Sequence, residues 1–177
     1  MSSSGQGADH PGAPYGRVTD PARYSALHDA ADELLERLER QYQVERTSGG
    51  AELDPQLAGS RGTAVVRLRP LAESAGALTV VYTDLPGLYV RLGDWHVEVL
   101  PRCGCDACDE DPNALVDELR RKATHLVAGE FQEELTGWPR RRLTYRFPDS
   151  AGWTLLDRGG PYGRRRAVRR WQPWTPR

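Results

Sequence analysis

Apolar residues recur along the chain with two periods, and each period predicts one kind of element. Over residues 21–42 they return every three or four positions, which indicates a helix of about six turns with one buried face. Residues 112–137 repeat this pattern and end on a glycine. Thr19 or Asp20 precedes the first stripe and Asp111 precedes the second, and these residue types cap helices. The sequence therefore predicts two long amphipathic helices.

Alternation of apolar and polar residues predicts strands between the two helices. Four such runs follow one another at residues 64–69, 78–83, 88–92 and 95–100. The short turns between them are typical of an antiparallel meander. Residues 45–62 contain several glycines and a proline, so they are expected to form a loop.

The loop between the last two runs predicts a register for the hairpin. Gly93 and Asp94 suit a two-residue loop, because a type II′ turn has glycine at its first central position. Such a loop pairs Leu92 with Trp95 and continues that pairing along both strands. The apolar residues then share one face, so Trp95 is expected to be buried and His96 exposed.

Two weaker strand signals, at residues 143–147 and 153–157, follow the second helix. The order of elements predicts an α+β fold, in which two long helices pack on a mainly antiparallel sheet made of a four-strand meander plus two C-terminal strands. Residues 1–17 contain few large apolar groups and are expected to be a disordered N-terminal arm. Residues 18–158 are predicted to form a single α+β domain, and residues 159–177 a basic tail rich in arginine and tryptophan.

Hydropathy and charge indicate where the protein is located and what kind of partner it would bind. The chain has no run of about 18 apolar residues, so no membrane-spanning helix is expected. Its N-terminus lacks the basic start and apolar run of a signal peptide, which favours the cytoplasm. From Trp138 onward the chain has 11 basic and 2 acidic residues, whereas the part before it is acidic. The basic end is therefore expected to pair with the acidic body or with an anionic partner.

All three cysteines lie within six residues, and they form the strongest candidate site. Cys103, Cys105 and Cys108 have the spacing C-x-C-x2-C, and a glycine between the first two lets the chain turn tightly. Thiolate ligands in a reducing compartment favour zinc. Two other interpretations stay open: thiols that act in redox chemistry, and cysteines that only pack or lie exposed.

A tetrahedral site needs a fourth ligand, and the sequence offers several. Asp106 and Asp109 lie within or beside the cluster. His28 borders the apolar stripe of the first helix and would reach the cluster if the end of that helix packs there. His96 lies seven residues before Cys103, so a continued strand would place it roughly 20 Å away.

The same segment carries a family resemblance. The motif Cys103-Gly-Cys-Asp-Ala-Cys-Asp-Glu110, preceded by Pro86-Gly-Leu88, Asp94-Trp-His96 and Thr19-Asp-Pro-Ala-Arg-Tyr24, resembles an uncharacterised actinobacterial family known only as a domain of unknown function. The likeness covers about residues 17–157. It implies no activity or ligand, and it agrees with an arginine-rich chain in which Lys122 is the only lysine.

The C-terminal tail gives a further possibility for function. Its arginines can neutralise phosphates and its tryptophans can stack on bases. These residues are Arg164, Arg165, Arg166, Arg169, Arg170, Trp171 and Trp174.

No catalytic motif is found, so whether the protein is an enzyme is left open. The leading hypothesis is a cytoplasmic interaction module with a structural zinc site and a protein partner. The alternatives are a metal-dependent hydrolase with an open zinc position and a nucleic-acid-binding protein that uses the tail.

Overall fold

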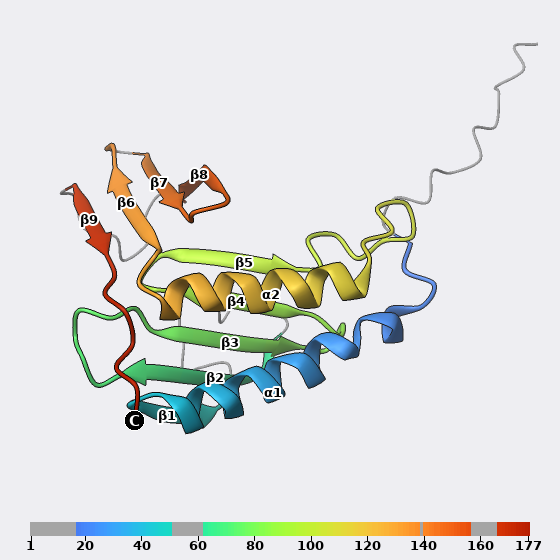
Figure 1. Ribbon diagram of the computed structural model, residues 1–177. Coiled ribbons are helices and arrows are strands. Elements are labelled where there is room, and N and C mark those ends of the chain that lie inside the picture. Colours follow the sequence, from blue (N-terminus) through green and yellow to red (C-terminus); the bar gives the residue numbers. More distant parts are fainter. Residues whose placement is uncertain (1–16, 51–61, 139, 157–165) are drawn as a thin grey trace, which may run out of the picture.

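The protein folds into two antiparallel sheets and two α-helices, as a computed structural model of residues 17–50, 62–138, 140–156 and 166–177 describes it (Figure 1). The predicted α+β class is therefore confirmed, but the prediction of one sheet is wrong. The predicted N-terminal arm, apart from Arg17, lies outside the described residues. No helix in the described ranges is long and apolar enough to cross a membrane.

The first sheet is a five-strand meander whose spatial order follows the chain. Its strands are β1 (Val44–Gly49), β2 (Gly62–Pro70), β3 (Leu78–Thr83), β4 (Leu88–Leu92) and β5 (His96–Leu100). The sequence missed β1, which was expected to belong to a loop. This strand is at the edge of the sheet and buries only Val44, so its sequence lacks the apolar alternation that identified the others.

Both helices lie across the same face of the first sheet (Figure 1). Helix α1 (Ala26–Gln41) follows a 3₁₀ turn, η1 (Pro21–Tyr24), instead of continuing from it as the sequence suggested. The side chain of Asp20 caps neither element. Helix α2 (Pro112–Val127) begins as predicted, because the Asp111 carboxylate accepts a hydrogen bond from the backbone N–H of Asn113.

Helix α2 ends ten residues earlier than the apolar stripe indicated. Gly129 has a φ of 73°, and a Cβ there would lie 2.5 Å from the backbone nitrogen of Pro173. Phe131 and Leu135, which had the spacing of a helix, are buried instead at the start of the second sheet. This sheet contains β6 (Gln132–Thr136), β7 (Arg141–Arg146), β8 (Ala151–Leu156) and β9 (Ala167–Arg170), in the order β8-β7-β6-β9.

The predicted register of the β4–β5 hairpin is wrong by one residue. The loop has three residues, so Leu92 pairs with His96 and Val90 pairs with Glu98. His96 is therefore buried, whereas Trp95 is half-buried in the loop. The reason is a long-range contact: the buried carboxylate of Glu133 accepts hydrogen bonds from three successive backbone N–H groups, those of residues 94–96, at 2.7, 3.0 and 2.9 Å.

The C-terminal segment is part of the fold from Ala167 onward and is not a separate tail. Strand β9 pairs with β6, and the chain then passes over the ends of both helices. Trp171 and Trp174 are buried in the main hydrophobic core. The indole N–H of Trp174 donates to the carbonyl of Gly76 at 2.9 Å, and its backbone N–H donates to the carbonyl of Val127 at 2.9 Å.

We expect Trp174→Phe to lower the free energy of unfolding by about 1–2 kcal/mol, because it leaves the Gly76 carbonyl without its indole donor. Chemical denaturation measures this change. Trp153→Phe is the matched control, since Trp153 is 58% exposed on β8. Equal stabilities of the two variants would contradict the structural role of the C-terminal segment.

Candidate metal centre

The cysteines lie in a loop, residues 101–111, that joins β5 to α2. The loop closes because the Glu110 carboxylate accepts hydrogen bonds from the backbone N–H groups of Arg102, Cys103 and Gly104, at 3.2, 2.9 and 3.4 Å. Burial raises the pKa of Glu110, but these backbone donors outweigh it and leave the pKa lowered. Glu110 is therefore ionised at neutral pH and holds both ends of the cysteine motif together.

Two backbone features bend the chain inside this loop. Gly104 has a φ of 72°, which only glycine adopts without strain, so the residue between the first two cysteines allows the tight turn. The N–H groups of Cys108 and Asp109 both donate to the carbonyl of Cys105, at 3.1 and 3.2 Å. This turn brings the third cysteine back over the second.

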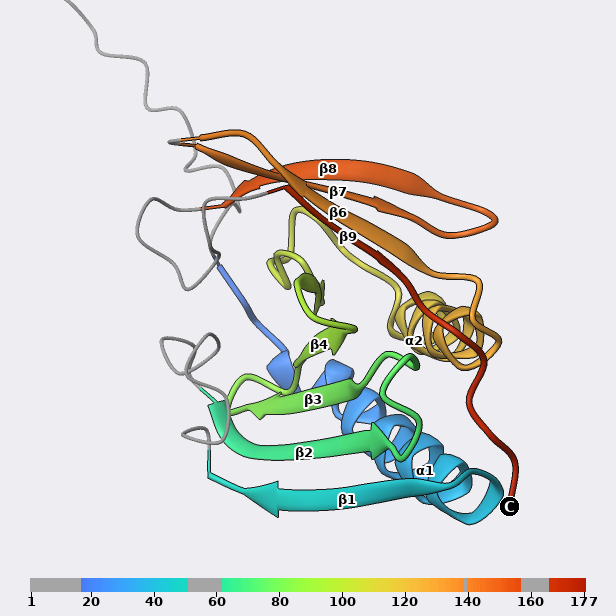
Figure 2. The same cartoon turned by 90° about the vertical axis from the view of Figure 1, so that its left-hand side faces the viewer.

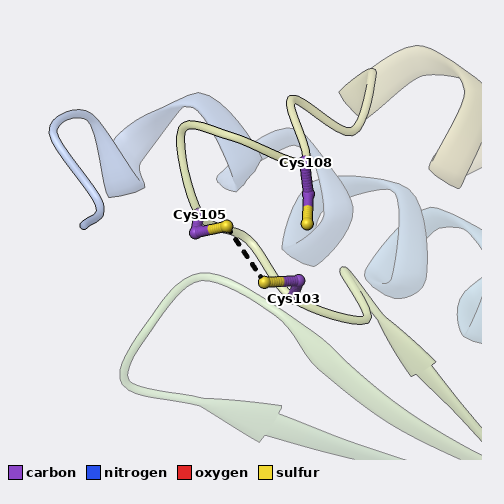
Figure 3. A group of neighbouring side chains, drawn as sticks. All are labelled: Cys103, Cys105 and Cys108. Atoms are coloured by element: carbon purple, nitrogen blue, oxygen red, sulfur yellow. Dashed lines mark hydrogen bonds between the residues drawn. The ribbon is translucent and has the colours of Figure 1, made fainter. Parts of the chain in front are cut away.

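The three sulfur atoms point into the same space (Figure 3). All three lie within 4.8 Å of one another, and the Sγ atoms of Cys103 and Cys105 are 3.1 Å apart. Cys105 is buried, whereas Cys103 and Cys108 are exposed. Three thiolates on a tetrahedral zinc ion would be roughly 3.5–4 Å apart, given Zn–S bonds near 2.3 Å. The predicted convergence of the cysteines is therefore present before the second helix.

The protonation of Cys108 disfavours a reactive thiol at this position. Hydrogen bonds with Cys103 and then Cys105 raise the pKa of Cys108 to about 12. A cysteine in this environment is protonated at neutral pH, whereas a nucleophilic or redox-active cysteine has a lowered pKa. A cation bound between the sulfurs would favour the thiolate form of Cys108, because cysteine binds metal ions as the thiolate.

The cysteine loop also binds the start of the first helix. The Asp106 carboxylate accepts hydrogen bonds from the backbone N–H and hydroxyl of Thr19, at 2.9 and 2.6 Å, and these bonds lower the pKa of Asp106. The backbone N–H of Asp106 donates to the carbonyl of Arg17 at 2.9 Å. Arg23 pairs with Asp109 at 2.8 Å. The loop therefore links the segment before α1 to the beginning of α2.

The structure does not bring a predicted fourth ligand to the sulfurs. Within the described ranges, no histidine or carboxylate oxygen joins the three cysteines in one ligand group. His28 Nε2 lies 3.0 Å from the carbonyl of Gly87, and His96 lies in the core against Glu98. Asp106 and Asp109 form the contacts with residues 17–23 given above. A cleft of about 310 Å³ adjoins the site, and Arg102 and Cys103 are among its lining residues.

The tail residues predicted to bind nucleic acid lie in different environments. Arg164 and Arg165 lie outside the described residues. Arg166 pairs with Glu134 at 2.6 Å, and Arg169 pairs with Asp94 at 2.7 Å. The indole N–H groups of the two tryptophans donate to Glu133 and to Gly76 inside the core. Trp171 and Trp174 are therefore unable to stack on bases, whereas nucleic-acid binding itself remains a prediction.

The structure contains a buried charge network that was not predicted from the sequence. Glu98 on β5 accepts from Lys122 on α2 at 2.5 Å and lies 2.8 Å from His96 Nε2, with all three side chains buried. Burial raises the pKa of Glu98, but the hydrogen bonds and charges of His96 and Lys122 outweigh it and lower the pKa to about 2. The one available signal was a lysine, the only one in the chain, on the apolar side of a helix.

Comparison with known proteins gives one match. A family model described as a family of unknown function (DUF6226) matches residues 3–177. No curated protein and no solved structure matches the chain.

Proposed function

Because the chain belongs to DUF6226, a family of unknown function, its role has to be inferred from the site, and we propose that Cys103, Cys105 and Cys108 bind one structural zinc ion. The observation that carries this proposal is the convergence of three sulfur atoms within 4.8 Å. Soft thiolate ligands select zinc among the common divalent metals of a reducing cytoplasm, which is where we place the protein.

The connections of the loop support a structural role for the ion. The same eleven residues hold Thr19 and Arg23 before α1, and Asp111 caps α2. An ion bound to the cysteines would fix the loop and, through these contacts, the starts of both helices. Metal binding would then contribute to folding, because the unfolded chain has no preformed site. We propose that the module organised in this way serves to bind a partner protein.

A second candidate function, metal-dependent hydrolysis, is favoured by the cleft beside Cys103. Three protein ligands and one water are typical of catalytic zinc, and the described residues supply three. Against it, the loop carboxylates at residues 106, 109, 110 and 111 are all engaged with the protein's own N–H, hydroxyl or guanidinium groups. Cobalt-substituted protein separates the two. Added azide would change the cobalt spectrum if the fourth position is open to solvent, and would leave it unchanged if the protein fills that position.

Elemental analysis of protein purified from cells under reducing conditions tests the zinc proposal. We expect about one zinc per chain in the wild type and loss of the metal in Cys105→Ser. The melting temperature should fall both in that variant and in wild-type protein treated with a chelator. Ala107→Ser is the matched control, because it introduces the same residue into the same loop at an exposed position and should retain the metal. Metal-free wild-type protein whose melting temperature responds neither to chelator nor to Cys105→Ser would refute the proposal.

A further inference from the structure

The outer face of the second sheet, defined by the alternate residues of β6–β9 that point away from the core, has an unusual composition. Glu133, Leu135 and Leu143 point inward and are buried. Their neighbours along the strands point outward. In Figure 2 the other described elements lie below this sheet, so no described helix or strand covers the outer face. Its prominent side chains are Arg142, Arg146, Arg170, Trp153, Leu155 and Val168, all of them exposed.

This face is strongly basic although the whole chain has a net charge of −1. A shallow groove of about 190 Å³ runs over it, and its lining includes Arg146, Arg166 and Arg170. Glu134 is the one acidic side chain on this face of the described strands, and its carboxylate already pairs with Arg166 at 2.6 Å. The remaining arginines therefore present a positive field to solvent, which attracts an anionic partner.

An aromatic residue lies beside these charges. Trp153 on β8 is 58% exposed, and the neighbouring Leu155 is 52% exposed. The guanidinium of Arg142 lies 4.5 Å from the centroid of the Trp153 ring, so the two side chains form a cation–π pair on this face. Thr144 separates Trp153 from Glu134 across the strands, so the aromatic residue and the basic groove belong to one continuous surface.

We propose that the outer face of the second sheet binds single-stranded nucleic acid, with Arg146 and Arg170 contacting phosphates and Trp153 stacking on an unpaired base. Trp153 and Arg170 are separated by three strand spacings of about 4.8 Å and by two residues along the strand, so these groups lie within roughly 16 Å of one another. An uncovered sheet face fits exposed bases, whereas the major groove of a duplex admits a helix or a two-stranded ribbon. An acidic protein would satisfy the arginines but offers no regular series of flat rings for Trp153.

The proposal moves nucleic-acid recognition away from the predicted tail. Of the arginines described in that segment, Arg166 and Arg170 face outward on the sheet, whereas Arg169 pairs with Asp94 on the inner side. The aromatic group comes from β8 and not from Trp171 or Trp174. This inference does not depend on metal at the cysteines, because the two surfaces share no residue.

Fluorescence anisotropy with a short labelled oligo-dT tests the proposal in the full chain. The affinity should fall as salt rises, with a log–log slope of about −0.7 for each phosphate contact. Arg146→Glu combined with Arg170→Glu should weaken binding by more than about tenfold and make the salt slope shallower. Trp153→Ala should weaken binding by about tenfold and leave the slope unchanged, because stacking releases no counterions. The matched control is Arg37→Glu with Arg40→Glu, which makes the same charge change on the exposed side of α1 and should have little effect.

Three results would overturn the proposal. The first is the absence of binding at low salt. The second is binding that the outer-face variants reduce no more than the α1 control does. The third is equal competition by polyglutamate together with no effect of Trp153→Ala, which would identify the face as a site for an acidic protein. Circular dichroism of every variant checks that the fold is retained.

Discussion

Glu133→Ala is expected to lower the free energy of unfolding by about 4–5 kcal/mol, because it removes the partner of four buried or partly buried donors at once. The Glu133 side chain accepts from three successive N–H groups of the β4–β5 loop and from the indole N–H of Trp171 at 3.1 Å. Each donor left without an acceptor costs roughly 1–3 kcal/mol, and water entering the site would recover part of that cost. The loss should be visible in chemical denaturation.

The neighbouring residue supplies the control for this prediction. Glu134→Ala removes a surface ion pair with Arg166, which is 71% exposed, and should cost at most about 1 kcal/mol.

Burial raises the pKa of Glu133 to about 7, although the backbone donors oppose the rise. Because the folded-state value exceeds the unfolded value near 4.5, the free energy of unfolding should fall as pH rises from about 4.5 to 7. That decline should be absent in Glu133→Ala, and its persistence there would show that another group causes it.

Lys122→Met should lower the free energy of unfolding by about 3–4 kcal/mol, because it removes the buried ammonium group that pairs with the buried Glu98 carboxylate. Lys122 Nζ lies 2.5 Å from Glu98 and 4.3 Å from the centroid of the Phe147 ring, in the layer between α2 and the edge of the first sheet. The stem of methionine replaces most of the packing of lysine, so the expected cost is electrostatic.

A double variant separates the unpaired charge from lost packing. Lys122→Met with Glu98→Gln removes both charges and should recover most of the loss, whereas a packing defect would persist. Lowering the pH should also weaken this interaction, because it protonates Glu98. Since the folded-state pKa of Glu98, about 2, is below its unfolded value near 4.5, the contribution of Glu98 to the free energy of unfolding is present above pH 4.5 and is lost as pH falls toward 2. A double variant as unstable as Lys122→Met alone would rule out the electrostatic explanation.

The elements that the sequence predicted best are those whose cause is local. Asp111 and a following proline define the start of α2, and apolar alternation located four strands of the first sheet. The end of α2 was wrong because its cause is remote: the backbone at Pro173 passes too close to Gly129 for a side chain. The hairpin register failed for the same kind of reason, since a carboxylate 38 residues from Trp95 fixes the loop.

In the candidate site, too, the features with a local cause were predicted and those with a remote cause were not. The spacing of the cysteines and the glycine at position 104 predicted that the sulfurs converge, and they do. The attachment of Asp106 to Thr19, 87 residues away, could not be read from either segment alone. The C-terminal tryptophans were expected to lie in an exposed tail but are buried. The residues around them in the sequence are basic and show no regular spacing of apolar positions, yet both indole groups enter the core because the segment crosses the ends of two helices.

X-ray absorption at the zinc edge tests the metal site most directly, because it counts the sulfur ligands of the bound ion. We expect three sulfur atoms at about 2.3 Å and one nitrogen or oxygen at about 2.0–2.2 Å in the wild type. Cys105→Ser, where any zinc remains, should lose one sulfur from this shell. A zinc ion surrounded by nitrogen and oxygen alone would contradict the account, because it would place the metal away from Cys103, Cys105 and Cys108.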